Sequence, residues 1–319
     1  MTLSILARVK KLTARTNGMP AGIRYLPAGT VGGGADASLP VWTPTDEQLA
    51  AAKAAVNGFS LWEFVKKILN QGHAGSCTGN GWAGAKALLA CKPLGQAVWV
   101  SVLYLYWYER QRNGDTATDA GAMVSDGAFV LSQRGAPLDA DYPYSDDPRA
   151  VVQKPPAALD SKAAAHKILN PMSVSADFDH IKARLLAGYP VVFGFEVYES
   201  FESTATLRTG VVTMPTADEG LLGGHCMYFI GATGEGNVQA RSRAAAVTHS
   251  IRDAVRKIAQ RVKVATGLSI LPTRLPDDCL IGVNSWGSEV GDGGRFYFPK
   301  AFVEQYASDF YTFDGETEH

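Results

Sequence analysis

Cysteine is scarce in this sequence, and its few cysteines form neither a disulfide framework nor a metal site. No Cys-x-x-Cys pair and no Cys/His cluster with zinc spacing occurs, so we expect no structural metal and no cofactor. Small secreted scaffolds are much denser in cysteine, which favours a cytoplasmic or other reducing compartment. The four cysteines of the 319 residues are Cys77, Cys91, Cys226 and Cys279.

The sequence also lacks an excess of charge and any long apolar run. It has 30 Lys and Arg residues against 31 Asp and Glu residues, so bulk electrostatics indicate neither nucleic acid nor a membrane surface as a partner. No stretch of about 18 apolar residues occurs, so no transmembrane helix is expected. Residues 1–12 do not form a signal peptide, because their apolar run is short and the charges follow it; export by another route stays open.

The order of the expected elements divides the chain into a helical part and a β-rich part. Helices are predicted over 48–56, from residue 77 onward, and over 98–110, 126–133 and 177–187. Strands are predicted over 191–198, 210–214, 226–232, 279–284 and 295–298. This order predicts an α+β fold with two lobes and a cleft between them. The expected parts are an N-terminal arm or pro-segment over 1–55, a mainly helical lobe over 56–188, and a β-rich lobe over 189–319.

An insertion interrupts the β-rich part at residues 234–278. Val247, Ile251 and Val255 begin an apolar stripe at helical spacing, and the other faces between residues 241 and 263 are basic, opposed only by Asp253. One interpretation is a surface helix that packs on its own domain. The other is a docking helix for an acidic partner or nucleic acid.

The stretch Gln71–Asn80 predicts a reactive cysteine. A glycine-containing turn delivers Cys77, and a run that can be helical follows over 81–90. The sulfur is then at or near a helix N-terminus, where unpaired N–H groups and the helix dipole favour a thiolate. The side-chain amide of Gln71 can donate a hydrogen bond to an oxyanion that forms beside the sulfur. The alternative for an isolated cysteine is a buried, inert side chain.

Two later stretches supply what a nucleophilic cysteine needs. His225 lies at the mouth of an apolar strand, roughly 150 residues after Cys77, where its imidazole can take the proton of the thiol. Asn284 follows another apolar strand, and its carbonyl oxygen can accept from the far ring N–H of His225. Trp286 can shield that hydrogen bond from water. A histidine that is merely satisfied in the core is the alternative for His225.

Together these motifs resemble those of the papain-like cysteine peptidases, the C1 family, and most closely its bacterial branch. The motifs that carry the resemblance, in their order along the chain, are Gln71-Gly72, Gly75-Ser76-Cys77, Gly224-His225 and Asn284-Ser285-Trp286-Gly287. The resemblance implies a helical lobe and an antiparallel, β-barrel-like lobe with the active site in the cleft between them.

The resemblance also implies roles for individual residues. Cys77 is expected to be the nucleophile and His225 the general base, then acid, with Asn284 orienting the imidazole. Gln71 and the backbone N–H of Cys77 are expected to form the oxyanion hole. The segment around Gly121 resembles the cleft edge whose backbone contacts a polypeptide substrate.

The chain departs from the papain pattern beside the nucleophile and at its N-terminus. Ala74 and Thr78 stand where that pattern has Cys and Trp, so the disulfide of secreted members is absent. The Gly- and Pro-rich segment 17–44 is a candidate built-in inhibitor. The leading hypothesis is a peptidase that works through an acyl-enzyme thioester. The alternatives are a papain-fold docking module that uses the basic insertion, and a transglutaminase-like enzyme that transfers the acyl group to an amine.

Overall fold

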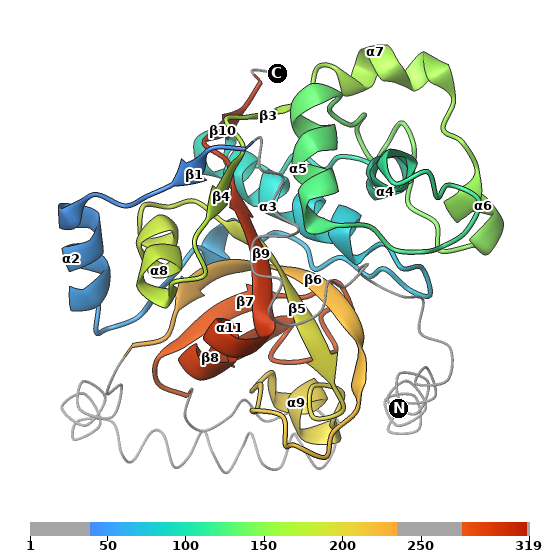
Figure 1. Cartoon of the computed structure of the whole chain (residues 1–319). Coiled ribbons are helices and arrows are strands. Elements are labelled where there is room, and N and C mark those ends of the chain that lie inside the picture. Colours follow the sequence, from blue (N-terminus) through green and yellow to red (C-terminus); the bar gives the residue numbers. More distant parts are fainter. Residues whose placement is uncertain (1–38, 235–275, 318–319) are drawn as a thin grey trace, which may run out of the picture.

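A computed structural model describes residues 39–234 and 276–317 (Figure 1). Its α-helices are α2 (Asp46–Ala54), α3 (Cys77–Leu94), α4 (Val102–Arg112), α5 (Val124–Gln133), α6 (Pro148–Val152), α7 (Asp160–Ala163), α8 (Phe178–Leu186), α9 (Thr204–Thr209) and α11 (Lys300–Tyr306). The 3₁₀ helices are η2 (Trp62–Phe64) and η3 (Ala157–Leu159). Its strands are β1 (Val41–Trp42), β2 (Phe59–Ser60), β3 (Ile168–Leu169), β4 (Met172–Val174), β5 (Val191–Tyr198), β6 (Leu221–Ala232), β7 (Cys279–Val283), β8 (Arg295–Pro299), β9 (Ala307–Thr312) and β10 (Gly315–Glu316).

One mixed sheet forms the centre of the described residues. Its strands lie in the order β1-β4-β9-β5-β6-β7-β8, with β2 added to β6, and all its pairs are antiparallel except β1 with β4. The α+β class predicted from the sequence is confirmed. The expectation of a barrel-like lobe needs correction, because no pairing in the described residues joins β8 to β1 and the sheet stays open.

The central strands are buried on both faces, which explains why they read as continuous apolar runs. One face packs against α3, α4 and α5 through residues such as Val192 and Tyr228. The opposite face carries Phe193 and Phe229, which stack at 3.6 Å between ring centroids and belong to the same core as α8 and α11. In Figure 1 the helices α3, α4 and α5 lie above the sheet, and α11 lies beside β8 below it.

Helix α3 packs directly on β6, and this contact determines where the site can form. At Gly84 an added Cβ would lie 2.5 Å from the ring of Tyr228, and at Gly81 it would lie 3.0 Å from the sulfur of Cys226. Both glycines therefore permit a close approach that a larger side chain would block. The helix begins at Cys77 and ends at Gly95, a left-handed cap with φ of 69°. The helix start is thereby held beside the middle of β6.

The structure corrects several predicted boundaries. The helix expected over 98–110 begins at Val102, because the Ser101 side chain accepts from the N–H of Tyr104 and caps it. The strand expected over 210–214 is wrong. Gly210 ends α9 in the left-handed region with φ of 73°, and only an isolated bridge of Val211 with Tyr297 follows.

Several expectations fall on residues outside the described ranges. These are most of the candidate inhibitory segment 17–44 and most of the basic insertion over 234–278. The last part of the inhibitory segment is described, and there Val41–Trp42 forms β1 at the edge of the sheet, beside β4. This strand is separated from β6 by three others, so it does not cross the site. Within the described ranges, no helix is both long and apolar enough to cross a membrane.

Candidate active site

Cys77 is the first residue of α3 and is fully buried. The turn before it is closed by local hydrogen bonds: the side chain of Asn80 donates to the backbone oxygen of Ser76 at 2.8 Å and to its hydroxyl at 3.1 Å. The prediction that Cys77 lies at or near a helix N-terminus is confirmed, because α3 begins at this residue. None of the four cysteines forms a disulfide.

His225 lies in β6 and meets Asn284 at the end of β7. The Nε2 atom of His225 is 2.9 Å from Oδ1 of Asn284, which also accepts from the backbone N–H of Ser285 at 2.7 Å. Because an amide oxygen only accepts, this contact assigns the proton to Nε2 and leaves Nδ1 as the other ring nitrogen. The indole of Trp286 stacks on the imidazole, with 4.9 Å between ring centroids and 28° between planes.

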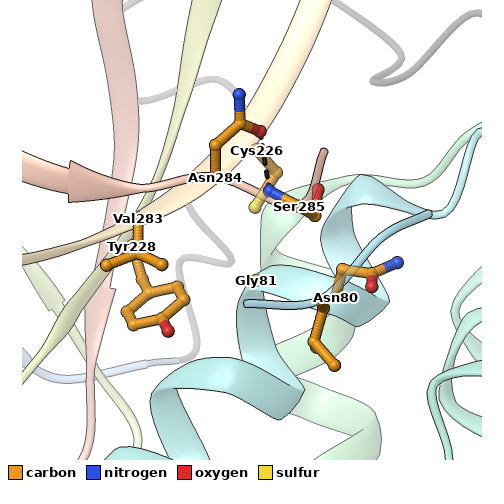
Figure 2. A pocket seen from close by; sticks show the side chains of 8 residues that line it. Asn80, Gly81, Cys226, Tyr228, Val283, Asn284 and Ser285 are labelled. Carbon is orange, nitrogen blue, oxygen red and sulfur yellow. Dashed lines mark hydrogen bonds between the residues drawn. The ribbon is translucent and has the colours of Figure 1, made fainter. Parts of the chain in front are cut away.

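A direct contact joins the histidine strand to the nucleophile. The backbone N–H of Cys226, the residue after His225, hydrogen-bonds to the Cys77 sulfur. Figure 2 shows Asn80 and Gly81 of α3 facing Cys226, Asn284 and Ser285 across a small cavity. Its volume of about 10 Å³ is room for about one water molecule. The structure therefore brings together the cysteine, histidine and asparagine that the sequence singled out.

The side chain of Gln71 is held in one orientation. The Ser285 hydroxyl donates to its Oε1 at 2.6 Å, and its Nε2 donates to the backbone oxygen of Ala74 at 2.9 Å. These two partners assign the amide oxygen and nitrogen. An amide nitrogen carries two hydrogens, so one N–H remains for another acceptor. Ser285 was not predicted to have a role of its own, although it lies inside the Asn-Ser-Trp-Gly motif.

Burial works against charge on both reactive groups. It raises the pKa of Cys77 to about 12, although backbone N–H groups of Cys226, Thr78 and Cys77 itself act in the opposite direction. Burial also lowers the pKa of His225 to about 4, against the effect of Asn284. The position of Cys77 at a helix N-terminus predicted a thiolate. In this conformation the effect of burial is larger than that of the helix terminus, and it favours a neutral Cys77 thiol and a neutral His225 imidazole.

Side chains from segments distant in the sequence hold the turn before Cys77, and no sequence pattern predicted these contacts. Asp119 accepts from the backbone N–H of Gly75 with both carboxylate oxygens, at 2.9 and 3.1 Å. Asp146 accepts from the N–H of His73 at 2.9 Å. The hydroxyl of Tyr144 lies 2.8 Å from the backbone oxygen of Gln71 and 2.7 Å from the Ser76 hydroxyl. These contacts join segments 44 to 73 residues apart.

Gly121 lies close in the chain to Asp119, one of the side chains that hold the turn before Cys77. Its N–H donates to the Tyr106 hydroxyl at 2.9 Å, and that hydroxyl donates to Asp119 at 2.6 Å. The N–H is therefore engaged within the chain, and a substrate contact at Gly121 would fall to its carbonyl oxygen. The residue has a φ of 77°, which favours glycine.

The described ranges hold no group of three or more His, Cys, Asp or Glu side chains placed to bind a metal ion. The residues gathered around Cys77 offer instead a thiol, an imidazole, an amide donor and backbone N–H groups. These are the parts of a nucleophilic acyl-transfer site.

Comparison with known proteins finds similarity to cysteine peptidases. The chain is 28% identical over 261 residues to a peptidase C1-like protein of Acanthamoeba polyphaga mimivirus, a match that covers 78% of this chain and 70% of that one. Its structure is similar to that of xylellain, a cysteine protease from Xylella fastidiosa, with a TM-score of 0.71, 27% identity, and coverage of 93% and 97% of the two chains. No family model matches the chain.

The fold is also shared with more distant proteins. Procathepsin B of Trypanosoma congolense has a TM-score of 0.63 at 15% identity, with coverage of 96% of this chain and 89% of that one. Procathepsin L2 from the larval midgut of Tenebrio molitor has a TM-score of 0.59 at 15% identity, with coverage of 96% and 80%. In sequence and in fold, the chain is thus similar to papain-like cysteine peptidases of the C1 family.

Proposed function

We propose that this protein hydrolyses peptide bonds of polypeptide substrates, with Cys77 as its nucleophile. The observation that carries the proposal is the contact between α3 and β6: the N–H next to His225 binds the Cys77 sulfur, while Asn284 holds the imidazole from its other side. These contacts support the assignment of a nucleophile, a base and an orienting residue, the three groups that acyl-transfer chemistry of this kind uses.

In the proposed reaction, the Cys77 proton moves to Nδ1 of His225 and the sulfur attacks the carbonyl carbon of the substrate. The imidazolium then protonates the leaving amine, and an acyl-enzyme thioester remains. His225 next takes a proton from water, which attacks the thioester and releases the acid and the thiol. Because burial favours the neutral pair, we infer that proton transfer accompanies substrate binding and attack.

The oxyanion is proposed to form beside Gln71. Its remaining amide N–H and the N–H of Cys77 would donate to the developing negative charge. Ser285 supports this role, because its hydroxyl fixes the amide so that nitrogen, not oxygen, is the group available. Such a pre-oriented donor acts mainly in the transition state, when the charge appears.

Several finer assignments stay predictions. They are the division of the chain near residues 55 and 188, the placement in the bacterial branch, and the compartment. The use of the basic insertion to bind an acidic partner, and inhibition by residues 17–38, concern parts of the chain outside the described residues. Transfer of the acyl group to an amine uses the same thioester, and adding amine acceptors to the assay would reveal the conjugates.

Covalent labelling tests the proposal. An epoxide inhibitor of thiol peptidases should modify Cys77, as located by mass spectrometry, and peptide hydrolysis should disappear in Cys77→Ala. Cys91→Ala is the matched control, because Cys91 is a buried cysteine of the same helix. An adduct on another cysteine, or hydrolysis unaffected by Cys77→Ala, would contradict the assignment.

A further inference from the structure

A buried glutamate lies directly behind the nucleophile, and the reaction above does not use it. Glu109 of α4 is fully buried, and the Thr78 hydroxyl donates to its Oε2 at 2.6 Å. Thr78 is also fully buried and follows Cys77 in the first turn of α3. One hydrogen bond therefore links this carboxyl group to the residue next to the reactive sulfur.

The other oxygen of Glu109 has no partner. Among the described residues, nothing lies within hydrogen-bond distance of Oε1. The neighbouring helix closes that side: an added Cβ on Gly127 of α5 would lie 2.8 Å from Oε1 and 2.1 Å from the Trp82 ring. A carboxylate with one buried, unpaired oxygen is costly, so this packing favours the protonated acid.

The charged groups around Glu109 do not offset that cost. Arg110 is adjacent, but its guanidinium donates to the backbone oxygens of Thr118 and Val151 and lies 4.3 Å above the Tyr106 ring. Asp126 of α5 acts on Glu109 as a like charge, although Arg112 and Asn113 hold its carboxylate at 2.8 and 2.6 Å.

The balance of these effects sets the titration of Glu109. Burial raises its pKa to about 8, with Asp126 acting in the same direction and with Thr78 and Arg110 acting against it. Charge on Glu109 would also be felt by the thiols that face it, since it raises the pKa of both Cys77 in α3 and Cys226 in β6. Protonated Glu109 leaves the sulfur undisturbed, whereas ionised Glu109 opposes negative charge on it.

We propose that Glu109 is a positioning residue that sets the alkaline limit of the enzyme: as a neutral acid it supports the first turn of α3 through Thr78, and on losing its proton to solvent it suppresses ionisation of Cys77. This inference rests on the proposed function of Cys77. It adds a third titrating group to a site whose proposed reaction otherwise uses only the cysteine and the histidine.

The first test compares pH profiles of the full chain. Glu109→Gln keeps the size and the acceptor for Thr78 but cannot ionise. At the same pH, peptide hydrolysis and alkylation of Cys77 in the wild type should fall about tenfold below those of Glu109→Gln above pH ~8 because of the new charge, whereas the two proteins should agree below that pH. Glu304→Gln, which removes an exposed carboxylate on α11, is the control and should keep the wild-type profile.

A second measurement follows the carboxyl group itself and needs no activity. In ¹³C NMR of the wild type, the Glu109 carboxyl signal, assigned by its loss in Glu109→Gln, should titrate with a midpoint near 8. Thr78→Val should raise that midpoint, because the hydroxyl stabilises the charged form.

The outcomes separate this inference from the proposed function. A wild type that neither hydrolyses peptides nor is alkylated at Cys77 overturns the function, while the NMR titration still reports on Glu109. A midpoint near the ordinary value for glutamate overturns the inference. So does a folded Glu109→Gln variant whose hydrolysis and alkylation show the same alkaline fall as the wild type.

Discussion

The two sides of the site are built in different ways. On the nucleophile side, the turn before Cys77 is held by side-chain hydrogen bonds from three polar residues, Asp119, Tyr144 and Asp146. On the histidine side, His225 lies in a central strand, paired with Phe195 of β5 and covered by the Trp286 ring. The first arrangement can be broken by removing one polar group, whereas the second is distributed over a strand ladder and an aromatic core.

This difference predicts where the protein is sensitive. Substitution of the polar side chains near Cys77 should change the reaction rate strongly, because only a few hydrogen bonds hold the turn before Cys77. Substitution of single apolar side chains near His225 should lower the free energy of unfolding by similar, moderate amounts, because many contacts stabilise this side of the site. The histidine itself is the exception, because charging it inside that core has a large cost.

The largest effect is expected on the nucleophile side, from Gln71→Ala. Loss of a pre-oriented donor to the oxyanion should lower kcat by about 10²–10³-fold with little change in KM. Gln133→Ala, at the exposed end of α5, is the control. Steady-state kinetics on a peptide substrate checks this, and a loss confined to KM would show that Gln71 binds substrate instead.

The second-largest effect is expected on the histidine side, as a change of the free energy of unfolding with pH. The pKa of His225 is lowered to about 4 in the folded chain, while the unfolded chain takes up this proton below about 6.5. The unfolded state thus binds more protons between these values, so the free energy of unfolding should fall as pH drops through this window. The full contribution is on the order of 3 kcal/mol.

Urea unfolding between pH ~6.5 and ~4 measures this effect as the difference between wild type and His225→Gln. His180→Gln, on the helix α8, serves as the control. A resting thiolate–imidazolium pair would raise the folded pKa of His225 above its unfolded value. Both states would then hold the proton throughout this window, and the difference between wild type and His225→Gln would stay constant from pH ~6.5 to ~4.

A smaller effect is expected from Asp119→Asn, which removes the charge that both the Gly75 N–H and the Tyr106 hydroxyl use. Hydrogen bonds to a charged group contribute about 2 kcal/mol, so the free energy of unfolding should fall by about that amount and kcat should fall with it. The exposed Asp218→Asn is the control. Unchanged stability and kcat in Asp119→Asn would show that the Asp119 carboxylate does not hold the turn before Cys77.

The smallest effect is expected from Trp286→Phe. The variant keeps an aromatic ring over His225 but loses part of the contact area, which should reduce the free energy of unfolding by about 1 kcal/mol. The rate should fall less than tenfold. If it fell as far as in Gln71→Ala, the contrast between the two sides of the site would be wrong.

The sequence predicted the elements whose signal is local. Strand β5 is predicted over its observed range, because seven of its eight residues are buried and the strand is almost wholly apolar and aromatic. The start of α3 was expected from the turn before Cys77. Strand β9 was not expected, since Ala307–Thr312 mixes polar and apolar residues and gains its burial only between β4 and β5.

The chemistry of the site was predicted less completely than its residues. Motif spacing pointed to Cys77, His225 and Asn284, which the fold brings together. The partners of Gly75 and Thr78 could not be predicted, because Asp119 and Glu109 lie 44 and 31 residues away and no sequence pattern pairs them with these groups. The direction of the Cys77 pKa also depends on burial, which a sequence does not reveal.

The most direct test of the central claim is a double-mutant comparison of the two sides. Peptide hydrolysis is measured for Cys77→Ala, His225→Ala and the double variant. If sulfur and imidazole act as one unit, each single variant should lose nearly all activity and the double variant should lose no more. Substantial activity in His225→Ala, or losses that multiply in the double variant, would contradict this account.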